Sequence, residues 1–140
     1  MINELEIEVL AEHIDELGHV NNARFLEYLE RGRIDWYNRC GDFMNLTGKP
    51  RLGTVVVNIN VNFRRECFAG DRLTVVTGPK SRGEKSYVLC QQINTAQGQR
   101  AADAEVTSVV MDLDARRTVA MPEPLARQFD GATIKPTIDR

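Results

Sequence analysis

Residues 15–22, which read DELGHVNN, place an acid, an imidazole and two amides around a glycine. A carboxylate can act as a general base or as a nucleophile, and an imidazole can orient a reacting group. The most helix-like segment of the chain, 22–40, follows directly. The first N–H groups of a helix have no partner inside it and lie at its positive end, so they stabilise an oxygen that gains negative charge. The segment therefore combines an acid with a helix start that favours anions.

Single residues of this segment have simpler explanations as well. Gly18 permits a backbone angle or a close approach that a side chain would forbid, and Asn21 or Asn22 can cap the helix. Metal binding by His13, Asp15 and His19 is an alternative, but no further acid or histidine is clustered there to complete the ligands. We therefore expect no metal and no cofactor.

A longer pattern carries a family resemblance. About a dozen spaced positions from Asp15 to Arg33 resemble the signature of the 4-hydroxybenzoyl-CoA thioesterase-like branch of the hotdog-fold acyl-CoA thioesterases: Asp15, Gly18, His19, Val20, Asn21, Asn22, Phe25, Tyr28, Leu29, Glu30 and Arg33. Later segments, 62–65, 69–71, 110–112 and 121–122, look like landmarks of the same family. The resemblance covers roughly residues 4–125.

The resemblance implies a hydrolysis of acyl-CoA to a carboxylic acid and free CoA. In the family, the aspartate at the position of Asp15 is the catalytic carboxylate, and the backbone N–H at the position of Asn22 polarises the thioester carbonyl. Whether Asp15 attacks directly or activates a water stays open, and Glu30 is a weaker rival for the catalytic acid. His19 could orient the carbonyl or pair with Asp15. Phe25 departs from the tyrosine that family members often carry.

Further residues are candidates for contacts with the substrate. Gly18, Asn21 and Phe25 belong to the expected pocket. CoA carries phosphates, so we expect basic side chains near a sheet edge to contact them. The candidates are Arg64, Arg65, Arg82 and Lys85. Each of these can also be explained as an ordinary solvated charge. An acyl carrier protein is the alternative carrier of the acyl group, and a non-catalytic module that binds acyl thioesters is the alternative function.

The remaining patterns predict an α+β fold. Residues 4–10 alternate between acidic and apolar side chains, which is typical of a half-buried strand. A long strand is expected at 54–63, and turns at 69–71, at Gly78-Pro79 with Gly83, and at 97–98 divide the rest into strands near 72–77, 86–94 and 100–112. A brief return near 118–121 and a short helix over 123–129 follow. Together with the resemblance, this predicts a hotdog fold, an antiparallel five-stranded sheet wrapped around one long helix.

The helix at 22–40 has a wide apolar face that includes Leu26, Leu29 and Trp36. Gly32 lies within this face, where glycine is costly, so we expect another backbone to approach it closely. Arg33 also projects into the apolar face. It either pairs with Glu30 or extends to water with its stem packed.

Length and composition are those of one soluble domain, 1–140, with a loosely held tail at 126–140. A net charge of −2 with interspersed signs argues against a nucleic-acid surface, and no apolar run is long enough to span a membrane. The start of the chain does not resemble a secretory signal, so a cytoplasmic protein is expected. Cys40, Cys67 and Cys90 are expected to be buried thiols. The exposed edge of the strand at 54–63 and the family resemblance predict a homodimer or homotetramer.

Overall fold

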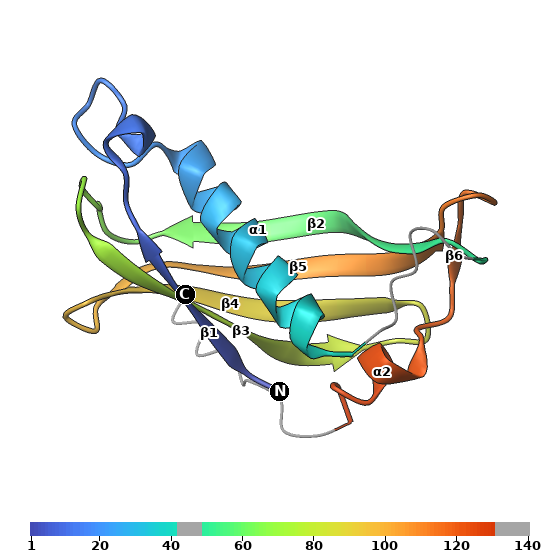
Figure 1. The fold of residues 1–140 in the computed structure, drawn as a ribbon. Helices are drawn as coiled ribbons and strands as arrows, with labels where there is room; N and C mark the ends of the chain where they lie inside the picture. The colour runs from blue at the N-terminus through green and yellow to red at the C-terminus, as the bar shows by residue number, and fades with distance from the viewer. Residues whose placement is uncertain (42–48, 131–140) are drawn as a thin grey trace.

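The computed structural model describes residues 1–41 and 49–130 (Figure 1). Within these residues the elements follow the order β1 Asn3–Glu8, a 3-10 turn at Ala11–His13, α1 Asn22–Arg39, β2 Leu52–Phe63, β3 Arg72–Arg82, β4 Ser86–Thr95, β5 Arg100–Asp112, β6 Arg117–Val119 and α2 Glu123–Ala126. The strands form one antiparallel sheet in the order β1-β3-β4-β5-β2, and the short β6 pairs with β5. No described helix is both long and apolar enough to cross a membrane.

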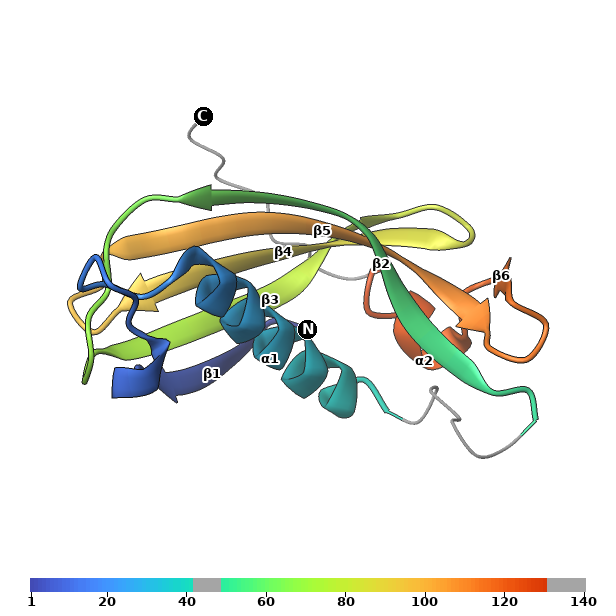
Figure 2. The same ribbon diagram turned by 90° about the horizontal axis from the view of Figure 1, so that it is seen from above.

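The sheet curves around α1, which crosses one of its faces between the outer strands β1 and β2 (Figure 2). Inward side chains alternate along the strands, as in β3, where Leu73, Val75 and Thr77 are buried. One long helix against a curved antiparallel sheet is the hotdog arrangement that the sequence predicted. The α+β assignment is therefore confirmed.

Two apolar clusters pack between α1 and the sheet. The first surrounds the amino-terminal half of α1 and includes Phe25, Tyr28 and Leu29. The second surrounds the carboxyl-terminal half, where Trp36 packs against Phe129 after α2. Ala126 and Phe129 are buried in this second cluster, so the expectation of a loosely held tail is wrong for residues 126–129. Residues 131–140 lie outside the described part of the chain.

The sequence misplaced one turn. A break was expected at Gly78-Pro79, but β3 runs through both residues to Arg82, and the turn falls at 83–85. The partner β1 pairs only with residues 72–77, so the missing N–H of Pro79 interrupts no bond on that side. The register shift between Pro79 and Ser81 accommodates the proline on the β4 side.

The helix face also differs in detail from the expectation. Leu26 is partly exposed, at 38%. The three atoms nearest to a Cβ built at Gly32 belong to side chains of the sheet, with Cγ1 of Val75 nearest, where the sequence had predicted a backbone. Arg33 is only 6% exposed and donates to the Oε1 atom of Gln91 at 3.0 Å. Both expectations for Arg33, a pair with Glu30 and an extension to water, are therefore wrong.

Candidate active site

The loop from Asp15 to His19 is a tight turn closed by its own backbone. The N–H of Asp15 donates to the carbonyl of His19 at 3.0 Å, and the N–H of Gly18 donates to the carbonyl of Asp15 at 3.0 Å. Gly18 has a φ of 86°, and a Cβ there would meet nothing within 4 Å. Glycine is thus required for its left-handed angle and not for a close approach. The carboxylate of Asp15 accepts from the N–H of Leu17 at 2.9 Å, which holds the acid at the turn.

Two neighbouring segments fix the end of this loop before α1 begins. The N–H of Val20 donates to the carbonyl of Cys67 at 2.9 Å, and the N–H of Asn21 donates to the carbonyl of His13 at 3.1 Å. His13 is buried, and its Nδ1 lies 2.7 Å from the hydroxyl of Tyr28. His13 therefore belongs to the core beneath the loop. No group of three or more side chains suited to a metal is found among the described residues.

Asn21 is the N-cap of α1, and its Oδ1 accepts from the N–H of Ala23 at 2.8 Å. The next N–H, that of Asn22, has no hydrogen-bond partner within the described structure. Asn22 lines a pocket of about 240 Å³ together with His19, Val20, Phe25, Phe63, Arg64, Arg65 and Glu66. A free N–H at the positive end of a long helix is suited to hold a carbonyl oxygen that becomes negative.

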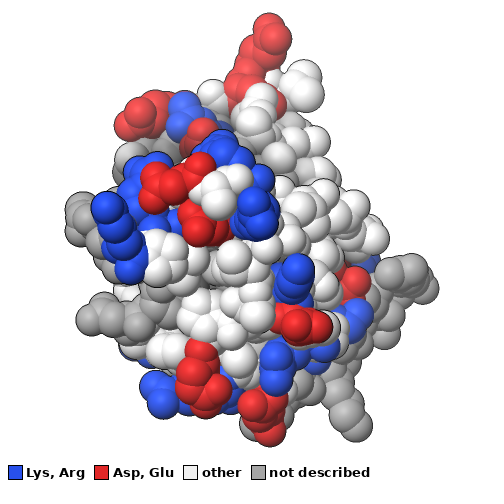
Figure 3. Space-filling model, turned by 90° about the vertical axis from the view of Figure 1, so that its right-hand side faces the viewer, with Lys and Arg blue, Asp and Glu red and all other residues white. Residues whose placement is uncertain are grey.

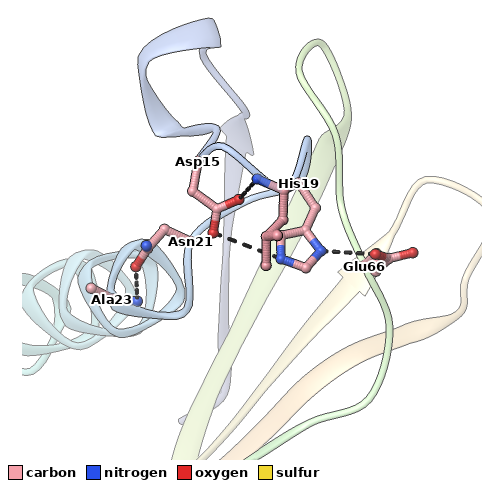
Figure 4. A network of polar contacts seen from close by, with 6 residues as sticks. Asp15, His19, Asn21, Ala23 and Glu66 are labelled. Carbon is pink, nitrogen blue, oxygen red and sulfur yellow. Dashed lines mark hydrogen bonds and ion pairs between the residues drawn. The ribbon is translucent and has the colours of Figure 1, made fainter.

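The imidazole of His19 lies between two carboxylates (Figure 4). Its Nδ1 is 2.8 Å from Oε1 of Glu66, and its Nε2 is 3.7 Å from Oδ2 of Asp15. The carboxylate of Glu66 can only accept when ionised, so Nδ1 carries the proton and Nε2 is the nitrogen that faces Asp15. In space, the imidazole of His19 therefore lies between the carboxylate of Asp15 and that of Glu66.

Glu66 was not among the residues that the sequence singled out. It lies 47 positions from His19 and directly after the family landmark at 62–65. Its position beside that landmark was the one feature of the sequence that could have indicated a functional role, because an isolated glutamate in a loop indicates none. Its backbone is held by the neighbouring bond between Val20 and Cys67.

The four basic candidates separate into two groups. Arg64 and Arg65 line the pocket, and Arg64 forms an ion pair with Asp103 of β5. Arg65 makes no ion pair with any described residue. Arg82 and Lys85 lie at the β3–β4 turn, at the opposite end of the sheet. That end of the molecule carries mixed positive and negative side chains (Figure 3), and Arg82 lies 3.5 Å from Asp130 there.

The three cysteines are buried, as the sequence predicted. Burial raises the pKa of the Cys67 thiol to about 11, and that of Cys40 to about 12. Burial likewise raises the pKa of Cys90 to about 11. A thiol with such a pKa is almost entirely protonated at neutral pH and is a poor nucleophile. The carboxylate and the imidazole are therefore the groups of this site that can react.

Comparison with known proteins identifies the family of this chain. The model of the thioesterase-like superfamily matches residues 9–129. The long-chain acyl-CoA thioesterase FadM of Escherichia coli is 36% identical over 126 residues, which cover 89% of this chain and 95% of FadM. The crystal structure of the probable thioesterase YbaW of Escherichia coli superposes with a TM-score of 0.80 at 36% identity, over 90% of this chain and 98% of that one.

A more distant structure shows the same fold. A mutant of 4-hydroxybenzoyl-CoA thioesterase, complexed with 4-hydroxybenzoyl-CoA, superposes with a TM-score of 0.82 at 19% identity, over 91% of this chain and 98% of that one. The family match spans most of the chain, and the helix start with its acid lies within it. The chain belongs to the thioesterase-like superfamily.

Proposed function

We propose that this protein is an acyl-CoA thioesterase, which hydrolyses an acyl-CoA to a carboxylic acid and free CoA. The observation that carries the proposal is the carboxylate of Asp15 beside His19, a residue that lines the same pocket as Asn22 with its unpaired N–H. The relationship to FadM, a long-chain acyl-CoA thioesterase, supports the same reaction. No thiol nucleophile is required.

In the proposed reaction, the thioester carbonyl oxygen accepts the hydrogen bond of the Asn22 N–H. Asp15 takes a proton from a water molecule, and the resulting hydroxide adds to the carbonyl carbon. The negative charge that forms on the carbonyl oxygen is stabilised by the start of α1. The C–S bond then breaks, and the proton returns to the sulfur of CoA. Direct attack by Asp15, through an anhydride that water cleaves, is the alternative route.

His19 acts in this proposal as a positioning residue, whose ring lies beside Asp15 and limits where that carboxylate can lie. Its Nδ1 is held by Glu66, which directs Nε2 toward Asp15. Phe25 and Phe63 pack against each other at 5.8 Å between ring centroids and form an apolar wall of the pocket. The acyl group would enter along this wall.

Arg65 is our candidate for the CoA phosphates, because it lines the pocket and has no ion pair with a described residue. Arg64 would contribute less, since Asp103 already balances its charge. Within one chain, Arg82 and Lys85 are too far along the sheet to share this role. Acyl carrier protein stays the alternative carrier, and the cytoplasmic location stays a prediction from the sequence.

We also propose that the chain forms a homodimer through β2, which can assemble further to a tetramer. Among the described strands, β2 pairs only with β5, so its other edge is open. Large apolar side chains are exposed on this strand and on the adjacent α1, namely Leu26, Ile34, Val56, Val57, Ile59 and Phe63. An open edge with apolar side chains is a surface for a second strand. Sedimentation at micromolar concentration should give a dimer or larger species, and a stable monomer would contradict this proposal.

The reaction is tested by measuring thiol release from aromatic, short-chain and long-chain acyl-CoAs. Asp15→Asn should lower turnover by about a hundredfold or more, because it removes the base or nucleophile while keeping the side-chain shape. Glu16→Gln is the matched control, since it removes one negative charge at the adjacent exposed position. It should retain native activity.

The same assay separates the alternatives. Acyl-pantetheine lacks the nucleotide, so a large loss of activity with it favours CoA as the carrier over acyl carrier protein. If native protein binds acyl-CoA but releases no thiol, and Asp15→Asn binds equally well, the protein is a non-catalytic acyl-thioester binder and the proposed reaction is wrong.

A further inference from the structure

A polar layer separates the two apolar clusters beneath α1. Gln91 of β4 donates through Nε2 to the carbonyl of Leu29 at 2.8 Å and to the hydroxyl of Thr77 at 2.9 Å. Its remaining oxygen accepts from Nη1 of Arg33 at 3.0 Å. Because both donor bonds of Gln91 are fixed by the helix and the sheet, its oxygen holds the guanidinium of Arg33 in one place.

The guanidinium of Arg33 is buried without a direct ion pair among the described residues. It makes no ion pair with a carboxylate within the described residues, and Gln91 supplies a neutral acceptor to only one of its five N–H groups. Burial lowers the pKa of Arg33, which Tyr37 and Glu30 partly oppose. A buried charge with so few partners is costly. The remaining N–H groups are therefore suited to an acceptor that the single chain does not provide.

The space beside Arg33 is a cavity of about 210 Å³ between α1 and β2. Its apolar walls come from Ile34 and Val56, and its polar groups come from Glu30, Arg33, Tyr37 and Thr54. An alkyl chain fits between such walls only if its end satisfies the polar groups. A hydroxyl group does so, because it accepts from Arg33 and donates to the carboxylate of Glu30. A carboxylate would accept from Arg33 but would repel Glu30.

We propose that this cavity binds the remote end of an acyl group that carries a hydroxyl, with that hydroxyl on Arg33. The inference rests on the proposed thioesterase function, which it extends to a substrate class, the hydroxylated medium- or long-chain acyl-CoAs. Arg33 is eleven residues after Asn22, so at 1.5 Å per residue it lies about 16 Å farther along α1. The partly exposed Leu26 and Ile59 lie on α1 and β2 between the two positions. They belong to the surface proposed above for the dimer, so the apolar path would run along the interface between the two copies.

The first experiment needs no variant of Arg33. Native protein is given saturated acyl-CoAs of increasing chain length and the matching derivatives with a hydroxyl at the last carbon. At the chain length that reaches Arg33, the hydroxylated substrate should have a kcat/KM about tenfold higher or more, through a lower KM, because it satisfies a buried charge. Equal values at every length, with normal turnover, overturn the inference and leave the thioesterase function intact.

Two further measurements complete the test. Arg33→Gln should abolish the preference for the hydroxyl, measured as the ratio of kcat/KM for the hydroxylated and the plain substrate. Arg31→Gln, at an exposed neighbouring position, should keep both the preference and the native activity. Calorimetry with Asp15→Asn protein should show the same preference in binding, so the inference can be judged even if no thiol is released. If Arg33→Gln instead dissociates the oligomer and the native protein shows no preference, the acceptor belongs to a second copy of the chain and the inference is wrong.

Discussion

Gly32 offers the sharpest test of how closely α1 packs on the sheet. A Cβ at this position would lie 2.5 Å from Cγ1 of Val75 and 3.1 Å from both Nε2 of Gln91 and Oγ1 of Thr77. Val75 is fully buried and β-branched, so its methyl group has little freedom to move away. Gln91 and Thr77 are bonded to each other and hold Arg33, so their displacement disturbs the polar layer.

The expected magnitude for Gly32→Ala follows from opposing effects. Alanine gains about 1 kcal/mol of helix propensity over glycine. Overpacking of a well-packed core costs about 1 to 3 kcal/mol, and each hydrogen bond lost from Gln91 costs about 1 kcal/mol more. We therefore expect the free energy of unfolding to fall by about 1 to 3 kcal/mol.

Urea denaturation at one fixed protein concentration measures this change, since the stability of an oligomer depends on concentration. Asn38→Ala is the control for propensity, because Asn38 is exposed on the same helix, and it should be neutral or slightly stabilising. In a Val75→Ala background, Gly32→Ala should cost at least about 1 kcal/mol less than in the native background. A Gly32→Ala protein more stable than the native one would refute the proposed contact.

Two further predictions concern the site and the thiols. Glu66→Ala should lower kcat about tenfold with little change in KM or stability, because in the proposed reaction the exposed carboxylate of Glu66 positions His19. Glu66→Gln keeps an acceptor for Nδ1 and should recover most of the loss. Equal kcat for all three proteins would contradict this role. Burial raises the pKa values of Cys40, Cys67 and Cys90 from about 9 to between about 11 and 12. The protonated thiols therefore stabilise the fold fully below pH 9, and the free energy of unfolding should fall as the pH rises toward 11. Urea denaturation across this pH range measures the fall, and a flat profile would contradict the prediction.

Local signals in the sequence were sufficient to place the helix and its start. The apolar periodicity of 22–40 and the asparagines before it predicted α1, which the structure begins at Asn22 and ends at Arg39. Alternation predicted β1 and β2, with boundaries displaced by two residues or fewer. The Asp15 loop could be predicted for the same reason, because its glycine angle and its N-cap depend on residues only a few positions apart.

Contacts between distant residues could not be predicted in the same way. The partner of Arg33 is Gln91, 58 positions later, and the periodicity of α1 says only that the arginine faces inward. The course of β3 through Pro79 depends on how far β1 extends beside it, which no local pattern records. Glu66 meets His19 only because two loops lie together. In each case the pairing across the sheet, and not the local sequence, decides the outcome.

The position of Glu66 shows how such a long-range contact becomes reliable. An exposed ion pair alone holds a side chain weakly, since it contributes little beyond about 1 kcal/mol and is screened by salt. Here the backbone supplies the precision, because Val20 is bonded to the carbonyl of the fully buried Cys67, the residue next to Glu66. On the other side, Arg64 is fixed to β5 through Asp103 and through the carbonyl of Ala101. The loop that carries Glu66 is therefore anchored at both ends to rigid elements, and the helix start, the acid and the imidazole keep their geometry because they share those anchors.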